Sequence, residues 1–131
     1  MEEVSKKVVS IPQSASEAYS QLRQLKETQQ RAMSSGNIRA AIDIGKQALG
    51  LAHSLTGPNV NSELAQLYYN LSNMHLNGVT HDPEKAEEYG QNAKKHSELD
   101  LKSAPDNQQA LELHSVILIS EGHRRILQVF N

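Results

Sequence analysis

Histidines and carboxylates are the residues of this chain with the widest chemical use, because imidazole is both a common metal ligand and a common general base. The chain has six histidines and fifteen Asp and Glu residues but no cysteine, which excludes a thiolate zinc site. It contains no His-x-x-x-His or His-Glu-x-x-His pair, no glycine-rich phosphate loop and no G-x-S-x-G motif. The sequence therefore predicts a protein that is not an enzyme, with no catalytic residue, metal site or cofactor.

Two of the histidines, His75 and His114, fall on apolar stripes of predicted helices. We expect them to be hydrogen-bonded core residues, because a lone histidine on such a stripe has no companion ligand in the sequence. An alternative stays open, in which an enzyme or metal site gathers Glu63, His75, Glu112 and His114 from separate helices. That site would have no linear motif.

Composition narrows the class of protein. The chain has 131 residues, 37% of them hydrophobic and 21% charged, with a formal net charge of −2. The absence of excess positive charge argues against a nucleic-acid partner. The longest apolar run, Val116–Ile119, is far too short to span a bilayer, and the first residues lack the basic and apolar blocks of a secretion signal. We expect a cytoplasmic protein that does not insert into membranes.

The apolar residues predict an all-α fold. Aromatic residues are only 4% of the chain, so the core must consist of Ala, Leu and Ile, which suits closely packed helices. Pro12 and the lack of a helical period predict an irregular N-terminal arm over residues 1–14. Spacings of three and four predict five helices, over about 15–33, 38–55, 61–76, 83–102 and from 106, the last with a possible break at Gly122. Residues 15–131 would form one domain of antiparallel hairpins. Helix starts are expected at Asn37, near Asn61 or Ser62, at Asp82 or Thr80 before Pro83, and at Asp106 or Asn107.

A weak internal repeat accompanies these helices. Adding 43 to Leu25 gives Tyr68 and then Leu111, three large residues on successive buried stripes. The same step takes the turn at Gly36 to the neighbourhood of Gly78 and then to Gly122. Turn and stripe recur together, as expected of a helical repeat protein.

The repeating residues resemble those of tetratricopeptide (TPR) repeats, nearest the kinesin light chain type. Gly36, Ala41 and Ala48 match the small residues of the turn and second helix, and Tyr68 and Ser72 match positions of the first helix. The units would cover about 16–57, 61–103 and, in part, 106–131. The chain departs from the pattern at Gln29, where a small residue is usual, and at Ala32 and His75, where an aromatic is usual. The resemblance implies a short TPR-like solenoid of about five helices.

By resemblance, such a solenoid binds a peptide or a partner domain in the concave groove lined by the first helix of each unit. The chain would then be an adaptor or structural subunit. The groove residues implied are Arg23, Lys26, Gln30 and Ser34, then Gln66, Tyr69, Asn70, Asn73 and Asn77, and then Gln109, Leu113 and Val116. Their Asn and Gln side chains suit a peptide backbone, because each amide both donates and accepts hydrogen bonds.

The last helix is apolar on almost every side, which is typical of a helix covered on more than one face. The residues that would form an interface there are Ile119, Ile126, Leu127, Val129 and Phe130. Three arrangements remain open. The helix caps the second unit under the N-terminal arm, it docks onto another subunit, or two copies of the chain complete each other as a homodimer.

Overall fold

The computed structural model describes residues 15–57, 59–76 and 80–130, with the side chains of Ala15, Gln128 and Phe130 excepted. The predicted N-terminal arm, residues 1–14, and the predicted groove residue Asn77 lie outside this range. For Phe130, only the backbone is described.

Within the described residues the chain is all-α and contains no strand, as predicted. The five helices are α2 (Ala15–Ser34), α3 (Ile38–His53), α4 (Val60–Met74), α5 (Pro83–Ser103) and α6 (Gln108–Phe130). Helix α4, expected to begin near Asn61 or Ser62, begins at Val60 after Asn59. Predicted capping residues occur at the starts of three other helices, α3, α5 and α6. Asn37 accepts a hydrogen bond from the backbone of Ala40 (3.2 Å), Asp82 from that of Lys85 (3.1 Å), and Asn107 from that of Ala110 (2.9 Å). Each cap satisfies an amide that has no partner within its helix.

The break predicted at Gly122 is wrong, because α6 continues through this residue to Phe130. A glycine inside a helix costs about 1 kcal/mol relative to alanine, which tertiary contacts can offset. Here Glu121 and Arg124, on either side of Gly122, are both buried and bonded to α5. These two anchors hold the intervening backbone in the helix.

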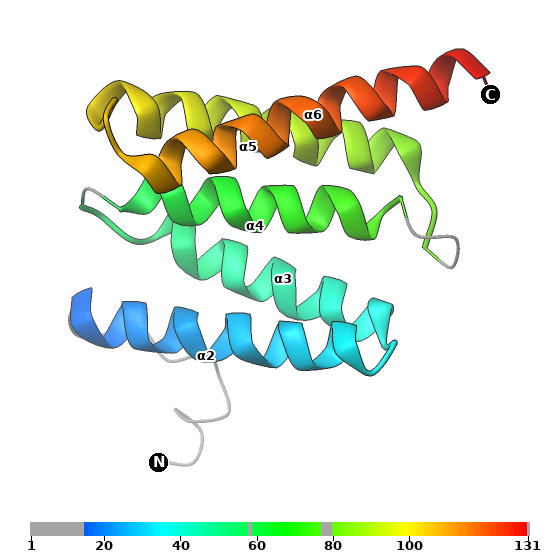
Figure 1. Cartoon of the computed structure of the whole chain (residues 1–131). Helices are drawn as coiled ribbons and strands as arrows, with labels where there is room; N and C mark the ends of the chain where they lie inside the picture. The colour runs from blue at the N-terminus through cyan, green and yellow to red at the C-terminus, as the bar shows by residue number, and fades with distance from the viewer. Residues whose placement is uncertain (1–14, 58, 77–79, 131) are drawn as a thin grey trace.

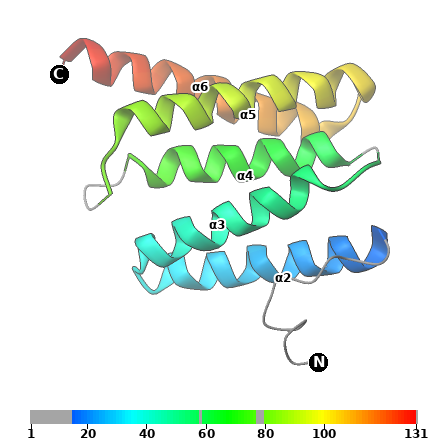
Figure 2. The ribbon, with the colours of Figure 1, turned by 180° about the vertical axis from the view of Figure 1, so that it is seen from behind.

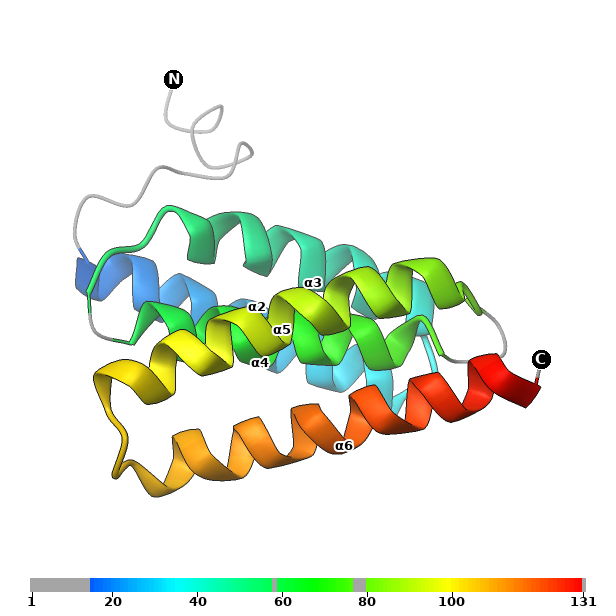
Figure 3. The same cartoon turned by 90° about the horizontal axis from the view of Figure 1, so that it is seen from above.

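Consecutive helices run antiparallel and pack against each other, with α2 at one end of the stack and α5 and α6 side by side at the other (Figures 1 and 3). The view from behind shows the same order (Figure 2). Seen from above, α3 lies on one side of the stack and α6 on the opposite side (Figure 3). Helices α2 and α4 run in the same direction, because a helix of opposite direction separates them along the chain (Figure 1).

The apolar core lies mainly between α2, α3, α4 and α5. Leu22, Leu67 and Leu71 are completely or almost completely buried. Alanines on facing helices are buried as well, which allows the backbones to approach closely. These alanines are Ala41, Ala48, Ala52, Ala65, Ala86 and Ala93. From α6 this core receives Ile117, with half-buried Leu113 packed against it.

No helix in the described part of the chain is both long enough and apolar enough to cross a membrane.

Candidate protein-binding surfaces

We call the predicted groove residues of α2 and α4 the α2–α4 polar face. It consists of Arg23, Lys26, Gln30 and Ser34 from α2 and Gln66, Tyr69, Asn70 and Asn73 from α4. Spacings of three and four place each set on one side of its helix. Lys26 joins the two sets, because its Nζ lies 2.8 Å from Glu63 Oε1 and 3.2 Å from Gln66 Oε1.

Polar groups near Lys26 are already occupied by partners within the protein. Glu63 forms an ion pair with Lys26, and the amide nitrogen of Gln66 donates to Ser62 Oγ at 3.3 Å. Both charged side chains are partly exposed, so this ion pair contributes only about 0.5 kcal/mol. This end of the face therefore offers few unsatisfied groups to a ligand.

The other end of the face has free amides. Asn70 is half-buried and Asn73 exposed, and neither side chain forms a hydrogen bond with any described residue. Helices α2 and α4 run in the same direction (Figure 1). Gln30 and Ser34 come after Lys26 in α2, and Asn70 and Asn73 come after Gln66 in α4, so these four residues lie toward the same end of the two helices. We call these four residues the amide end of the α2–α4 polar face.

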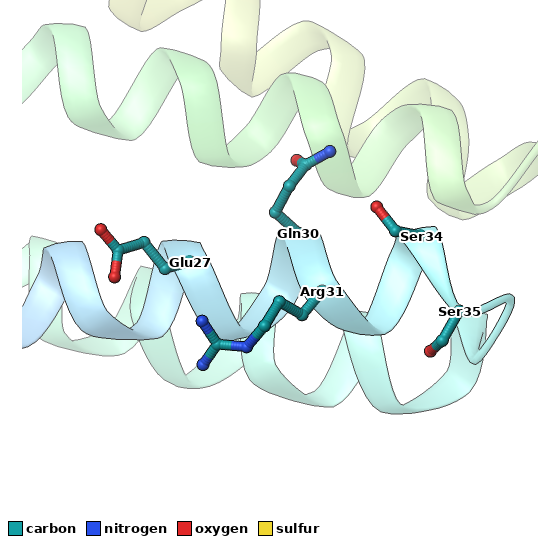
Figure 4. Close-up of a pocket in the computed structure, with 5 residues that line it drawn as sticks. All are labelled: Glu27, Gln30, Arg31, Ser34 and Ser35. Atoms are coloured by element: carbon teal, nitrogen blue, oxygen red, sulfur yellow. The ribbon is translucent and has the colours of Figure 1, made fainter.

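A shallow depression of about 520 Å³ adjoins the amide end. It is lined by Glu27, Gln30, Arg31, Ser34 and Ser35, all at the end of α2. The Gln30 side chain points from α2 toward α4 (Figure 4). The depression is open and is lined mainly by the carbon atoms of these polar residues, and it suits the side chain of a bound segment more than an enclosed small molecule.

Tyr69 and the predicted groove residues of α6 differ in exposure, since some pack against the core and others face solvent. Tyr69 is half-buried against the core, and Leu113 packs there too. Gln109 is exposed, and Val116 is 40% exposed. The contact between α4 and α6 is small compared with those between consecutive helices. Among the described residues, the α2 and α4 parts of the predicted groove are joined through the bonds of Lys26 to Glu63 and Gln66, and the α4 and α6 parts through the small helix contact.

A second surface lies on α6, where apolar side chains face away from the rest of the protein. Ile119, Ile126 and Val129 are 71%, 57% and 78% exposed, and Leu127 is half-buried. Leu111 and Leu118, which the interface prediction did not include, are exposed on the same side. Each residue of an α-helix is rotated by about 100° from the one before it. With this rotation, the exposed large residues lie along one side of α6, and the small residues Ser115 and Gly122 lie between them on the same side. We call this set the α6 stripe, formed by Leu111, Ser115, Leu118, Ile119, Gly122, Ile126 and Val129.

The opposite side of the second half of α6 is polar and faces inward. Glu121 is buried, and its carboxylate accepts hydrogen bonds from Gln91 (2.8 Å) and Lys94 (3.3 Å) of α5. Arg125 of the next turn also pairs with it at 3.0 Å. These bonds hold the pKa of Glu121 below its ordinary value, against the opposing effect of burial. In this half, the helix has its polar face inside and its apolar face outside.

Arg124 is the most deeply buried charge on α6, with 3% of its side chain exposed. Its Nε donates to Glu87 at 2.9 Å, and Nη1 donates to Ser120 (3.1 Å) and lies 3.5 Å from the Ser72 hydroxyl. Its guanidinium occupies the space where a Cβ at Gly90 would lie. Gly90 is therefore the residue that allows Arg124 to enter the α4–α5–α6 junction.

The histidines do not form a metal site in the described part of the chain, where no group of three His, Asp or Glu residues could hold an ion. Glu63 pairs with Lys26, and Glu112 accepts from Gln108. His114 Nδ1 lies 2.8 Å from the Ser97 hydroxyl, as expected of a hydrogen-bonded core histidine. His75 is buried against Tyr89, but neither ring nitrogen has a partner among the described residues, so its predicted hydrogen bond is wrong there.

A row of rings that the sequence did not indicate crosses α3, α4 and α5. Tyr68 stacks on His96 with ring centroids 5.7 Å apart, and its hydroxyl lies 2.9 Å from His53 Nε2. Burial lowers the pKa of His96 and raises that of Tyr68. His96 Nδ1 lies 2.8 Å from Asn61 Oδ1. These rings bond to each other and to neighbouring helices, and they serve packing.

The chain matches no protein-family model, and neither a curated protein nor a solved structure is significantly similar to it.

Proposed function

We propose that this chain is a non-enzymatic protein-interaction module, an adaptor or structural subunit whose helical hairpins form a short TPR-like stack. Its ligand would be an extended peptide segment of a partner protein, held along the α2–α4 polar face. The observation that carries the proposal is the amide end, where Asn70 and Asn73 form no hydrogen bond with any described residue.

The chemistry of this end fits a peptide backbone. An amide side chain presents a donor and an acceptor at once, so it can match the N–H and C=O groups of an extended segment. Ser34 adds a hydroxyl and Gln30 a third amide from α2. The depression next to them would take one side chain of the segment. Bound segments would then be selected by backbone contacts and one anchoring residue.

Selection from a random peptide library on the purified chain tests this proposal, because the partner protein does not have to be identified first. Peptides recovered from the selection are then titrated by fluorescence polarisation against the Asn70→Ala/Asn73→Ala variant. We expect their affinity to fall at least about 10-fold, since two backbone hydrogen bonds contribute about 1 kcal/mol each.

A matched control is the Lys46→Ala/Gln47→Ala variant, which truncates two exposed residues on α3. Its affinity for the same peptides should be unchanged, and circular dichroism should show equal helicity for all three proteins. Tyr69→Ala is a less direct test, because this ring also contacts the core. If no peptide is recovered, or if the asparagine variant binds as tightly as the control, the α2–α4 polar face is not the binding site.

A further inference from the structure

The α6 stripe carries large apolar side chains on the outside of the protein over most of the helix. Ile119 and Val129 are more than two-thirds exposed, and Leu111, Leu118 and Ile126 are all exposed. The last turns of α6 also extend beyond the start of α5 (Figures 1 and 3). An apolar surface of this length is typical of an interface.

The order of residues along the stripe tells what could cover it. Two small residues, Ser115 and Gly122, interrupt the large ones, so the stripe has two recesses separated by two turns. A second helix packed along the stripe needs a large side chain opposite each recess. The stripe itself has this pattern when its direction is reversed.

An antiparallel copy of α6 centred near residue 120 satisfies this requirement at both recesses, and two large residues meet at each end of the contact. Leu118 then faces the partner copy's Gly122, Ser115 faces the partner copy's Ile126, and Leu111 faces the partner copy's Val129. Shifting the two copies to a centre between residues 118 and 119 would put Ser115 opposite Gly122 and leave a void. Pairing about a two-fold axis is also the commonest symmetry of protein dimers.

Charges along the helix do not oppose this contact. The stripe itself contains no ionisable side chain from Leu111 to Val129. Glu112 and Arg125 lie on its two edges, where solvent can still reach them. The flanking charges are therefore compatible with an apolar centre and a polar rim.

From this fit we infer that the α6 stripe binds a second copy of this chain, with the two α6 helices antiparallel about a two-fold axis near residue 120. The inference goes beyond the proposed peptide site, because it concerns a different side of the protein. A dimer of this kind would present two α2–α4 polar faces to one partner, which raises avidity without any new contact.

Sedimentation equilibrium of the full chain over a range of concentrations tests the pairing. We expect a dimer whose dissociation constant rises about 100-fold or more in Leu118→Glu, since the charge enters the interface twice. Val129→Glu, at the most exposed position of the stripe, should act in the same direction without disturbing the fold. Gln109→Glu adds the same charge to an exposed position of α6 outside the stripe and should leave the dimer intact.

Disulfide trapping tests the direction and register, because the chain has no cysteine of its own. In the inferred dimer the two copies of residue 119 are about 3 Å apart along the axis, whereas those of residue 129 are about 27 Å apart. Under mild oxidation, Ile119→Cys should therefore cross-link to itself and Val129→Cys should not. A mixture of Leu111→Cys and Val129→Cys should form the mixed dimer.

Three results would overturn the inference. The full chain could stay monomeric at every concentration, which would mean that the stripe is covered by another protein or by the N-terminal residues. Dimerisation could survive both glutamate substitutions, which would place the contact elsewhere. Self-linking of Val129→Cys would show that the helices pair in parallel. Peptide binding is measured separately, so these results do not decide the proposed function.

Discussion

In the described part of the chain, a glycine in one helix makes room for a long polar side chain from another at two places, which are filled differently. At Gly45 of α3 the space is taken by Gln29 of α2, the other helix of the same hairpin. At Gly90 of α5 it is taken by Arg124 of α6. We call these the Gly45 crossing and the Gly90 crossing.

The Gly45 crossing is neutral. Gln29 is buried, and its amide nitrogen donates to the backbone carbonyl of Ala41 at 3.3 Å and lies 4.0 Å from Met74 Sδ. Leu71 closes the same space, only 3.0 Å from where a Cβ at Gly45 would lie. Apolar contacts of the core surround the Gly45 crossing. The free energy that it contributes to folding should therefore depend little on salt or pH.

The Gly90 crossing is charged. Arg124 brings a full positive charge into the junction, where Glu87 is its counterion and where Nη2 has no hydrogen-bond partner among the described residues. Removing a buried guanidinium from water has a large cost, which its ion pair and hydrogen bonds offset only in part. The comparison indicates that α2 to α5 are held together mainly by apolar packing, whereas the second half of α6 is attached through polar groups.

Arg124→Ala should have the largest effect on this attachment. It removes the ion pair with Glu87, leaves the Ser72 and Ser120 hydroxyls without this donor, and creates a cavity over Gly90. We expect a loss of about 2–4 kcal/mol in the free energy of unfolding, measured by urea denaturation. Arg125→Ala, one residue further along, truncates a 65% exposed side chain and should cost less than about 1 kcal/mol. Equal effects of the two variants would mean that Arg124 does not anchor α6.

Gly90→Ala should be the next largest in effect. The new methyl group occupies the position of the Arg124 guanidinium, so Arg124 must leave its bonds to Glu87 and Ser120. We expect a net loss of about 1–3 kcal/mol, although alanine is favoured over glycine in a helix by about 1 kcal/mol. In the double variant with Arg124→Ala, the methyl group meets no guanidinium and should cost nothing further. Additive losses in this double-mutant cycle would contradict the proposed steric coupling.

Gly45→Ala should give a smaller loss, about 1–2 kcal/mol, since Gln29 carries no charge and loses only neutral contacts. The two substitutions should also differ in how the loss of unfolding free energy depends on salt. Between low salt and about 0.5 M NaCl the loss caused by Gly45→Ala should stay constant, whereas that caused by Gly90→Ala should shrink by a few tenths of a kcal/mol, because salt reaches only the 30% exposed Glu87 side of the Arg124–Glu87 pair. The same salt response in both would mean that the two crossings do not differ in electrostatics.

The helices could be predicted because their signals are local. The spacing of apolar residues gave the five helices, Asn37 marked the start of α3, and Asp82 and Asn107 were each one of two candidates for the starts of α5 and α6. Each of these signals depends on residues within a few turns of one helix and not on the neighbouring helices. The boundaries accordingly agree to within a few residues.

The Gly45 crossing could be predicted only in part. Gln29 stood out in the sequence as a polar residue where the TPR pattern has a small one. The structure gives the physical reason, since the small residue is on the facing helix, at Gly45. Where two helices cross closely, the small residue that makes room can lie on either helix. A sequence pattern along one helix does not show which of the two carries it.

The Gly90 crossing and the orientation of α6 could not be predicted from periodicity. Apolar residues occur on nearly every side of α6, so their spacing does not determine which side faces inward. The rule that charged residues lie outside would have placed Glu121 and Arg124 on the surface, and both are buried. The one signal available was Gly90 itself, a glycine in mid-helix with no turn to require it.

Acid should weaken the attachment of α6 before it affects the rest of the protein. The pKa of Glu87 lies below its ordinary value of 4.5, because hydrogen bonds and charge from Arg124 outweigh the opposing effect of burial, and the pKa of Glu121 is lowered as well. A lowered pKa stabilises the folded state above the ordinary value, and this contribution is lost as the pH falls through the folded-state pKa. Glu87→Gln/Glu121→Gln should therefore cost about 1–2 kcal/mol at pH 7 and progressively less as the pH is lowered below 4.5. A cost independent of pH would contradict this account.

Asp100 should show the opposite pH dependence, with the smallest effect. It lies on the buried side of α5 with Gly90, and no cation among the described residues forms an ion pair with it. Burial raises the pKa of Asp100 above its ordinary value of 3.8. A raised pKa means that the folded state binds the proton more tightly, so the ionised carboxylate is destabilising at neutral pH. Asp100→Asn should increase the free energy of unfolding by about 0.5–1 kcal/mol at pH 7 and leave it unchanged at pH 3, measured by urea denaturation at both pH values. A loss of stability at pH 7 would show that the Asp100 carboxylate has a stabilising partner.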